Sequence, residues 1–377
     1  MRVFSIGAGM ILQDQILPSL YQLQRLGEIE DITVCARHQD KLDALANHPP
    51  IVEAFPGHSF HPHAGNYEDV LNTLPPRQLV IVALPDQLHY EVTMAALKAG
   101  QHVLCVKPLV LKTSESLEIE HEAKRRNLLV AIEYHKRFDD RSLMARQLYR
   151  QGKFGDFRLG HACLHEKWHY RNSNFQNWFT PENSDAFTYI GCHYVDLVHF
   201  ITGLKPASVS VCGIREKFPN GNEGILWADA RVIWENGACL NLQNSLGYPQ
   251  SGPGSNLQGM TLFCTGSGEG AMIRHSDQYR GLEYSTTDGY SEPSPDYFSY
   301  VDLGKLTPVG YGYRSIEYIV RAAKNNPDLD KIDAEGIIAT PANSRYNELS
   351  TEAARLSLAS NGREAIIDYE QLAVRIR

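Results

Sequence analysis

The chain has 377 residues, of which 43% are apolar and 21% are charged. These fractions are typical of a soluble globular protein, and the length fits two domains better than a single core. A formal net charge of −8 argues against the broad basic surface of a nucleic-acid-binding protein. No uncharged apolar stretch approaches the roughly 20 residues that cross a bilayer, so we expect no membrane span.

The cysteines and the amino-terminal sequence predict the compartment. The seven cysteines are scattered and include no C-x-x-C pair. An odd, dispersed set favours free thiols in a reducing environment over a disulfide framework. The sequence goes from Met1 directly into a short apolar run, without the longer apolar segment and cleavage site of a signal peptide. We therefore expect a cytoplasmic protein.

Up to about residue 140, apolar runs alternate with helical patterns. The expected strands are Arg2–Ile6, Asp31–Ala36, Gln78–Ala83, His102–Val106 and Leu128–Ile132. The expected helices lie near Gln13–Leu26, Asp40–Ala46, Tyr90–Ala99 and Ser114–Arg126. The interval Asn47–Asn66 is rich in proline and histidine and predicts a loop with room for one short strand. Such alternation is typical of βαβ units that build a parallel sheet.

Beyond residue 140 the strands become longer and fewer helices separate them. The expected strands are Phe157–Trp168, Ser208–Arg215, Trp227–Trp234, Ala238–Ser245, Met260–Thr265 and Ala365–Tyr369. Helices are expected near Arg141–Gln151, Ala186–Thr202, Tyr313–Asn325 and Ala342–Ser360, and loops at Gly247–Gly254 and Ser285–Gly312. The pattern predicts a mainly antiparallel sheet with helices on one face. We divide the chain into an α/β domain at 1–138 and an α+β domain at 139–377, whose last helices can pack back on the first domain.

A glycine-rich turn follows the first strand. Gly7 permits a tight turn, and Gly9 allows the backbone to approach a pyrophosphate held at the start of the next helix. Leu12 stands where a dinucleotide fingerprint has its third small residue, so the helix must stand off slightly from the strand. Glycine-rich turns also occur for structural reasons. The strand, turn and helix together favour a dinucleotide site.

The end of the second strand indicates which dinucleotide would bind. A carboxylate at this place would hydrogen-bond the ribose hydroxyls of NAD, but the sequence has Ala36, Arg37 and His38. Arg37 offers a planar fork that suits a 2′-phosphate. The alternative is a solvated strand-end arginine, which is common at protein surfaces. We expect NADP to be preferred over NAD.

An ammonium group follows His102–Val106, the fourth of the expected strands. Lys107 follows Gln101–Val106 and precedes Pro108, which restricts the lysine to extended backbone geometry. Ligands of parallel sheets lie beyond the carboxyl ends of the strands. A lysine at a strand end normally extends its ammonium group to solvent. Its place beside a nucleotide-binding sheet favours a role in substrate or cofactor binding.

Four motifs, taken in their order and spacing, resemble one family. They are Gly7-Ala-Gly9, Ala83-Leu-Pro85-Asp86-Gln-Leu-His89, Val103-Leu-Cys-Val-Lys107-Pro108-Leu and Gly191-Cys-His193-Tyr-Val-Asp196. Together they resemble the NAD(P)-dependent group of glucose-fructose oxidoreductase, inositol dehydrogenase and rhizopine catabolism proteins. The resemblance runs through nearly the whole chain. It implies an amino-terminal Rossmann domain and a carboxy-terminal α+β domain with a mainly antiparallel, open-faced sheet.

The resemblance also implies site residues. Besides Gly7, Gly9 and Arg37, the expected cofactor contacts are Met10, Ile11, Leu84, Pro85, Gln87, His89 and Lys107. The family usually has glutamate before the lysine, where this chain has Val106, and aspartate four residues before the histidine, where it has Tyr189. A phenol can hydrogen-bond a sugar hydroxyl but cannot stabilise a charged histidine as a carboxylate does. The expected catalytic set is Lys107, Tyr189 and His193.

Alcohol oxidation requires a base that takes the hydroxyl proton while hydride leaves the same carbon. His193 suits this task because the ordinary pKa of histidine is close to neutral pH, and Lys107 would bind and polarise the reacting oxygen. Without the resemblance, a structural histidine would be the simpler interpretation of His193. Tyr189 and His193 are four residues apart on a helix and can reach one pocket. Asp196 either tunes His193 or only accepts a structural hydrogen bond.

Alternation along the strand that begins the second sheet puts several polar side chains on one face. They are His161, Cys163, His165, Lys167 and His169. A metal site is one interpretation, but Lys167 in the middle would repel a cation, so we expect no metal. The resemblance instead implies that Lys167, His165 and His169, with Tyr189 and Asp196, bind substrate. Sheet packing or a subunit contact is the structural alternative.

The resemblance implies a dehydrogenase or reductase that acts on a sugar, a polyol or a sugar derivative. Two alternatives remain at this point. One is a glycoside hydrolase that keeps its nucleotide bound and oxidises its substrate transiently, and the other is a regulator that senses a nucleotide without catalysis. We expect a homo-oligomer, either a dimer or a tetramer, that associates through the carboxy-terminal sheet.

Overall fold

The computed structural model describes residues 1–277, 284–287, 289–291 and 297–377. The chain packs as two compact units. The first unit comprises residues 1–110, 114–139 and 295–344, and the second comprises residues 111–113, 140–294 and 345–377. In the described part of the chain, no helix has both the length and the apolar character needed to cross a membrane.

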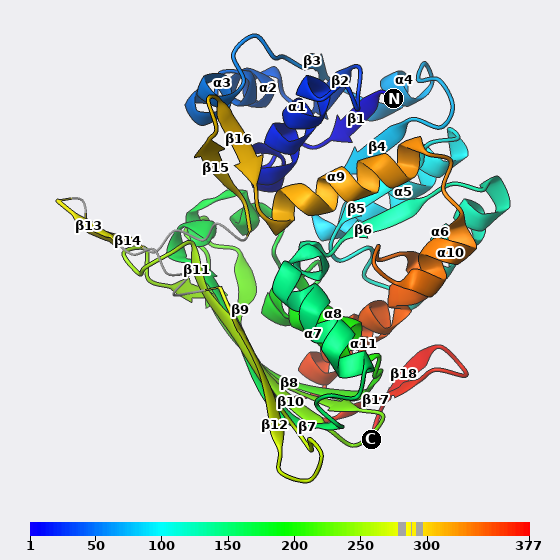
Figure 1. The fold of residues 1–377 in the computed structure, drawn as a ribbon, viewed down its shortest axis with the longest axis vertical. Helices are drawn as coiled ribbons and strands as arrows, with labels where there is room; N and C mark the ends of the chain where they lie inside the picture. Colours follow the sequence, from blue (N-terminus) through cyan, green and yellow to red (C-terminus); the bar gives the residue numbers. More distant parts are fainter. Residues whose placement is uncertain (278–283, 288, 292–296) are drawn as a thin grey trace. The chain divides into compact units, whose positions relative to one another are not determined.

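A parallel sheet forms the centre of the first unit, as the sequence predicts, and it has six strands (Figure 1). Its strands are β1 (Val3–Ile6), β2 (Ile32–Ala36), β3 (His61–Ala64), β4 (Leu79–Val82), β5 (His102–Val106) and β6 (Val130–Glu133). They lie in the order β3-β2-β1-β4-β5-β6, and every neighbouring pair is parallel. The residues of β1, β4, β5 and β6 are all buried, which explains their continuous apolar runs. The order reverses between β1 and β4, and ligands of such sheets bind beyond the strand ends at this point.

Helices connect the strands of this sheet. They are η1 (Leu12–Ile16), α1 (Leu17–Arg25), α2 (Gln39–Ala46), α3 (Pro49–Ala54), α4 (Tyr67–Leu71), η2 (Asp86–Leu88), α5 (His89–Lys98), α6 (Thr113–Arg126) and η3 (His135–Phe138). The last part of the unit adds a hairpin, β15 (Ser299–Asp302) with β16 (Leu306–Val309), and the helices α9 (Tyr311–Lys324) and α10 (Leu329–Glu335). Ile316, Ile319 and Val320 of α9 are fully buried in the same core as Leu12 of η1. A late segment of the chain therefore completes the first core.

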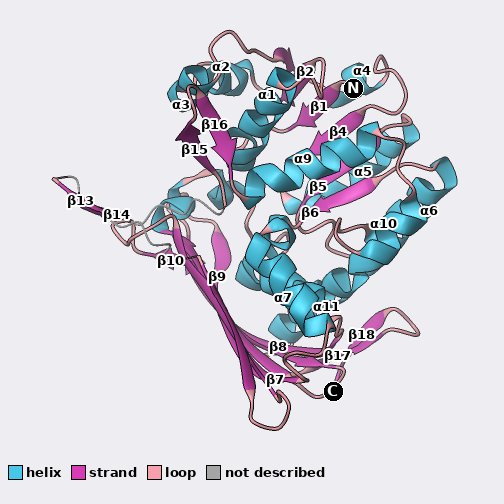
Figure 2. Cartoon of the chain, in the orientation of Figure 1, coloured by secondary structure: helices cyan, strands magenta, loops and turns pink. Residues whose placement is uncertain are grey.

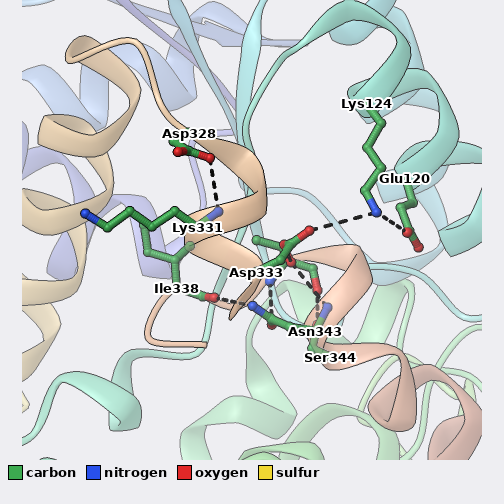
Figure 3. A network of polar contacts seen from close by, with 9 residues as sticks. Glu120, Lys124, Asp328, Lys331, Asp333, Ile338, Asn343 and Ser344 are labelled. Carbon is green, nitrogen blue, oxygen red and sulfur yellow. Dashed lines mark hydrogen bonds and ion pairs between the residues drawn. The ribbon is translucent and has the colours of Figure 1, made fainter. Parts of the chain in front are cut away.

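A polar network joins α6 to the segment around α10 (Figure 3). The Lys124 ammonium lies 2.8 Å from a Glu120 carboxylate oxygen and 3.9 Å from one of Asp333. Thr340 Oγ1 donates a hydrogen bond of 2.5 Å to Asp333, and Asp328 caps α10 by accepting from the Lys331 amide. These contacts fix the end of the first unit beside α6.

The second unit contains a sheet of eight strands (Figure 2). They are β7 (Phe157–Lys167), β8 (Pro206–Lys217), β9 (Glu223–Trp234), β10 (Cys239–Tyr248), β11 (Asn256–Cys264), β12 (Ala271–Ser276), β17 (Ala365–Asp368) and β18 (Ala373–Ile376). Their order is β12-β11-β7-β10-β9-β8-β17-β18. The pair β7 and β10 is parallel and the other pairs are antiparallel. The prediction of a mainly antiparallel sheet is confirmed.

Helices cover one face of this sheet. They are α7 (Asp140–Arg150), η6 (Phe187–Gly191), α8 (Cys192–Thr202) and the part of α11 (Pro341–Ala359) that belongs to this unit. Gly191 packs so closely on β10 that a Cβ atom there would lie 2.7 Å from Asn244 Oδ1. On the opposite face, Leu159, Phe263 and Met272 are 52%, 43% and 52% exposed. The sheet is therefore open on this face.

The remaining elements are short. After β7 come the single turns η4 (Trp168–Asn172) and η5 (Asn174–Asn177), and a small hairpin pairs β13 (Tyr284–Thr286) with β14 (Gly289–Ser291). The prediction of an unstructured loop at Ser285–Gly312 is wrong for the described residues, because the hairpin β15–β16 and the start of α9 lie within it. The rest of this predicted loop, at 288 and 292–296, lies outside the described residues.

Candidate active site

Gly7 adopts a backbone conformation that L side chains rarely take. Its φ is +109°, and a Cβ atom there would lie 2.1 Å from the carbonyl oxygen of Ala83. The Gly7 amide donates to Cys35 O, and the Ala83 amide donates to Ile6 O. The ends of β2, β1 and β4 are thus tied together where the strand order reverses. Any side chain at Gly7 would force these strand ends apart.

The helix that follows begins at Met10, directly after Gly9. A Cβ atom at Gly9 would meet no atom within 4 Å. Unpaired amides at a helix start and free space above a glycine suit a pyrophosphate. Met10 and Ile11 are half-buried beside this turn. The residues present therefore fit a dinucleotide.

Two of the expected cofactor residues lie in exposed positions on neighbouring loops. Arg37 directly follows β2 and is exposed, so its guanidinium can meet a ligand from solvent. Gln87 is exposed in η2, after half-buried Leu84 and Pro85 at the end of β4. The structure therefore places these four residues beyond the carboxyl ends of β2 and β4, where the sequence predicts them.

His89 is placed differently from the other expected cofactor residues. It is the first residue of α5 and has no exposed surface. Its Nδ1 lies 2.7 Å from the Pro108 carbonyl oxygen, and its Nε2 lies 2.8 Å from the Leu84 carbonyl oxygen. Both ring nitrogens are therefore occupied by the backbone of the two loops that follow β4 and β5.

Lys107 follows β5, two strands away from β1, and is half-buried. Its peptide bond to Pro108 is cis. The residue before it, Val106, pairs with Glu133 at the end of β6. Lys107 therefore occupies the strand end at which the sequence predicts it.

Glu133 is a buried carboxylate that the sequence did not reveal as a site residue. One of its oxygens accepts from Gln15 Nε2 at 2.8 Å and from Ser315 Oγ at 2.6 Å, and the other lies 2.8 Å from His135 Nδ1. Burial acts to raise the pKa of Glu133, but His135, Ser315 and Gln15 outweigh it and lower the pKa. Glu133 is therefore a fixed negative charge that joins η1, β6 and α9. The only signal in the sequence was an acidic residue at the end of an apolar run.

In the second unit, Tyr189 and His193 lie on either side of the junction between η6 and α8. The five residues of η6 form a π-turn, a local widening that often occurs at functional sites. The Tyr189 ring packs against Phe175, Trp178 and Phe179, with centroid distances of 4.9 to 5.9 Å. Tyr189 is thus part of a packed aromatic cluster.

His193 is 7% exposed, and its Nδ1 atom is buried. Further along the helix, Asp196 is 1% exposed and accepts a hydrogen bond of 2.7 Å from the Tyr346 hydroxyl of α11. Asn347 Nδ2 contacts the Cys192 carbonyl oxygen at 3.4 Å. Helix α11 therefore supports α8 with polar groups directly beside His193. Asp196 has a structural partner, and a role in tuning His193 stays a prediction.

His165 of β7 lies on the face of the sheet opposite to Gly191 at the start of α8. The partner of β7, β10, points Leu242 and Asn244 towards Gly191 at the start of α8. Leu164 pairs with Asn244, whereas His165 pairs with Ser245 and points to the opposite face of the sheet, because side chains alternate along a strand. His165 Nδ1 lies 2.8 Å from Ser245 Oγ.

Lys167, the last residue of β7, and His169, in the turn η4 that follows, both contact a neighbouring loop. The Lys167 ammonium donates to the carbonyl oxygens of Gln250, at 3.2 Å, and Gly252, and it lies 4.9 Å from the centre of the Tyr248 ring. His169 Nδ1 lies 3.2 Å from Gln250 Oε1. Burial lowers the pKa of Lys167 and of His165. These side chains form a second polar cluster, which the rings of Tyr170 and Phe175 connect to Tyr189.

Both units match models of one protein family. Residues 1–134 match the oxidoreductase family with an NAD-binding Rossmann fold, GFO/IDH/MocA, and residues 142–266 match the GFO/IDH/MocA carboxy-terminal domain. Inositol 2-dehydrogenase 1 of Saccharopolyspora erythraea is 34% identical over 133 residues, which cover 35% of this chain and 37% of that protein. D-glucoside 3-dehydrogenase of Escherichia coli is 26% identical over 219 residues, which cover 56% of each chain. The chain spans less than half of the length of the first curated relatives that it matches.

Solved structures share the fold over nearly the whole chain. The scyllo-inositol dehydrogenase of Lactobacillus casei with bound NAD(H) and scyllo-inositol superposes with a TM-score of 0.70 at 16% identity, covering 96% of this chain and 97% of that one. GenD2 from gentamicin A biosynthesis, in complex with NAD, gives a TM-score of 0.73 at 17% identity, covering 98% and 96%. With both domain models matched in sequence order, the chain belongs to the GFO/IDH/MocA family of NAD(P)-binding oxidoreductases.

Proposed function

We propose that the chain transfers hydride between NADP(H), preferred over NAD(H), and a secondary alcohol or ketone of a sugar, a polyol or a sugar derivative. One observation carries the proposal. Lys107 directly follows a strand of the same parallel sheet in which the turn at Gly7 and the helix start after Gly9 fit a dinucleotide. The names of relatives, inositol and glucoside dehydrogenases among them, support the substrate class.

In this proposal the nucleotide supplies the nicotinamide carbon that takes or gives the hydride. The chain supplies the groups that bind the reacting oxygen of the substrate and transfer its hydroxyl proton. Lys107 binds and polarises the reacting oxygen, because an ammonium group stabilises developing negative charge. His193 takes the hydroxyl proton in oxidation and returns it in reduction. Since Nδ1 of His193 is buried, Nε2 is the nitrogen that we assign to this proton transfer. Tyr189 donates a hydrogen bond to a neighbouring substrate hydroxyl.

The preference for NADP rests on Arg37. It is exposed after β2, and the sequence there offers no carboxylate to accept the ribose hydroxyls of NAD. A guanidinium fork matches a 2′-phosphate with two parallel hydrogen bonds. Met10, Ile11, Leu84, Pro85 and Gln87 line the same strand ends and complete the nucleotide contacts that we propose.

The substrate contacts that we propose in the second unit are Tyr189 and His193, with Asp196 behind them. His165, Lys167 and His169 form the second polar cluster with Ser245 and Gln250, and their part in substrate binding stays a prediction. We do not assign them a metal, since Lys167 would oppose a cation there. A substrate long enough to reach this cluster would meet hydrogen-bond donors and aromatic rings.

A screen of sugars and polyols with NADP and with NAD tests the proposal. We expect reduced nucleotide to form with at least one polyol or sugar, measured by absorbance of the reduced nicotinamide. Cleavage of a glycoside without net formation of reduced nucleotide would select a hydrolase instead. Nucleotide binding without either reaction, across a broad panel in both directions, would favour a regulator.

We also propose that copies of the chain associate through the open face of the second sheet, in a cytoplasmic homo-oligomer. Leu159 pairs with Phe263, and Phe263 pairs with Met272, so these exposed side chains form one row across β7, β11 and β12. A continuous apolar row on a sheet face is typical of a protein interface. None of the seven cysteines, all of which lie in the described part of the chain, forms a disulfide, as expected in a reducing compartment.

A further inference from the structure

His89 makes a contact that the proposed hydride transfer does not use directly. Its two ring nitrogens meet two carbonyl oxygens, Pro108 O at 2.7 Å and Leu84 O at 2.8 Å. A carbonyl oxygen can only accept a hydrogen bond. In either neutral tautomer, one ring nitrogen has a lone pair in place of a proton, and this lone pair would face a carbonyl oxygen at hydrogen-bonding distance. Only the imidazolium form donates to both.

A buried cation requires compensation. His89 has no exposed surface, and it begins α5, where the helix dipole opposes a positive charge. Asp86 of η2, 2% exposed, supplies a negative charge one turn earlier, and the Cys105 side chain of β5 also hydrogen-bonds the ring. Burial acts to lower the pKa of His89, but Cys105, Asp86 and the Leu84 carbonyl outweigh it and raise the pKa to about 9.

The two carbonyls belong to the loops that carry the proposed chemistry. Leu84 follows Ala83, whose carbonyl oxygen packs on Gly7 in the dinucleotide turn. Pro108 follows Lys107 directly. A rigid five-membered ring that bonds both loops fixes the distance between them, and a side chain with a single donor atom could not do so.

We propose that His89 is a buried imidazolium that ties the loop after β4 to the loop after β5 and thereby positions Lys107 beside the bound nucleotide. His89 is in this view a positioning residue, which contacts neither substrate nor cofactor. The role in positioning rests on the proposed function, whereas the charge of the ring does not. The charge of His89 and its role in positioning Lys107 can therefore be tested by separate experiments.

Nitrogen NMR of the full chain, labelled at its histidines, measures the charge directly. The His89 ring signals are assigned by through-bond correlation to its own backbone, so no variant has to fold. We expect both ring nitrogens to carry protons at pH 7. A neutral tautomer of His89 at that pH would overturn the proposal.

Asp86→Asn then tests the positioning role without altering the ring or either carbonyl. We expect the pKa of His89 to fall by about one unit, as for the loss of a nearby opposite charge. In a plot of kcat against pH, the decline at high pH should shift to lower pH by the same amount. The KM for the nucleotide should stay within about twofold. If the titration of His89 moves and the kcat profile does not, the positioning role is wrong.

His121 lies on the exposed surface of α6, so His121→Gln is the matched control. This variant should leave the dependence of kcat on pH unchanged. If the wild-type chain turns over no sugar or polyol, the proposed function fails, but the NMR result still decides the charge of His89. In that case the carbon signals of the Lys107 side chain take the place of kcat. They should shift as His89 is titrated, and their invariance would refute the link between the two residues.

Discussion

Val106 and Glu133 are direct partners across the parallel strands β5 and β6. Paired residues of neighbouring strands point to the same face, so a carboxylate lies beside the position where the family usually has glutamate. Glu133 is bonded to Gln15, Ser315 and His135. Its negative charge thus lies one strand away from the family position, held by η1 and α9.

Glu133→Gln should destabilise the chain because it removes a buried charge that has three partners. We expect a loss of about 3 kcal/mol in the free energy of unfolding, the range found when one partner of a buried ionic network is removed. Ser315→Ala, which removes one neutral donor to the same oxygen, should cost only about 1 kcal/mol. Denaturant unfolding of both variants measures the difference. Equal losses would contradict the assignment of Glu133 as the charged centre.

The pKa of Glu133 is lowered in the folded chain, so its contribution to stability depends on pH. A carboxyl group with a lowered folded pKa stabilises the fold above its unfolded pKa, and this contribution is lost as pH falls through the folded value. The unfolding free energies of wild type and Glu133→Gln should therefore converge in acid. A difference that stayed constant from neutral to acidic pH would show that Glu133 is not ionised in the fold.

Glu348 of α11 should give the opposite dependence of stability on pH. It is 1% exposed, and burial, followed by smaller effects that include Asp196 and Glu352, raises its pKa to about 8. The folded state therefore holds a proton that the unfolded state releases near 4.5. Stability should fall as pH rises from about 4.5 to about 8, by at most about 1.4 kcal/mol per pH unit.

Glu348→Gln cannot ionise and should remove this slope. The variant should resemble wild type at pH 5 and exceed it in stability at pH 8.5, as followed by thermal unfolding across that range. Glu370→Gln, an exposed acid after β17, serves as the control and should follow wild type. Parallel curves for wild type and Glu348→Gln would refute the raised pKa.

Lys107→Ala and His193→Ala should each abolish most turnover while leaving the nucleotide bound. General acid or base groups typically contribute about 100-fold to 10,000-fold to the rate, and we expect losses in kcat of that size. Nucleotide affinity, measured by fluorescence or calorimetry, should change far less. Lys98→Ala, an exposed lysine at the end of α5, is the control. Wild-type turnover in either variant would refute the role of that residue.

Arg37→Asp should shift the cofactor preference from NADP towards NAD. The loss of hydrogen bonds to a charged phosphate, each worth about 1.5 to 3 kcal/mol, corresponds to at least about tenfold weaker use of NADP. The new carboxylate can accept the ribose hydroxyls of NAD. The ratio of kcat/KM for the two nucleotides is the measurement. Lys41 is an exposed residue on α2, and Lys41→Asp makes the same change in charge as a control. Equal shifts of the cofactor preference in both variants would show that the change in net charge, and not a contact of Arg37, causes the effect.

Phe263→Asp should dissociate the proposed homo-oligomer. Phe263 lies in the middle of the apolar row, between Leu159 and Met272, and a charge there would be desolvated on association. Leu303→Asp, at a leucine that is 76% exposed in the first unit, is the matched control. Sedimentation should show a smaller species for Phe263→Asp alone. If Phe263→Asp has the same size as wild type, the interface lies elsewhere on the chain. If the wild type is a monomer, the proposed homo-oligomer is wrong.

The strands of the first sheet could be predicted because each is a buried apolar run between turn signals. Strand β3 could not be located, because it is the edge strand and its sequence, His61 to Ala64, is polar and contains proline. The parallel pairing of β7 with β10 depends on a contact between residues 80 apart in sequence, such as His165 and Ser245, which no local pattern encodes.

Site residues divide in the same way. The positions of Gly7, Arg37 and Lys107 were predictable because their place at a strand end is a local property of the sequence, whereas their roles in binding stay predictions. The network of Glu133 was not, because its partners Gln15 and Ser315 come from the two ends of the first unit. The face occupied by His165 was also hidden, since alternation shows which side chains share a face but not which face the helices cover.

The core of the first unit includes Ile316, Ile319 and Val320 of α9, although the sheet that they cover ends at Glu133. A ribosome therefore synthesises all six strands of this sheet and most of the second unit before it makes the helix that completes the first core. During that interval the nascent sheet exposes an apolar surface. A chain cut shortly after residue 294 would retain the dinucleotide turn but should aggregate, and supplying α9 as a separate peptide should restore its solubility.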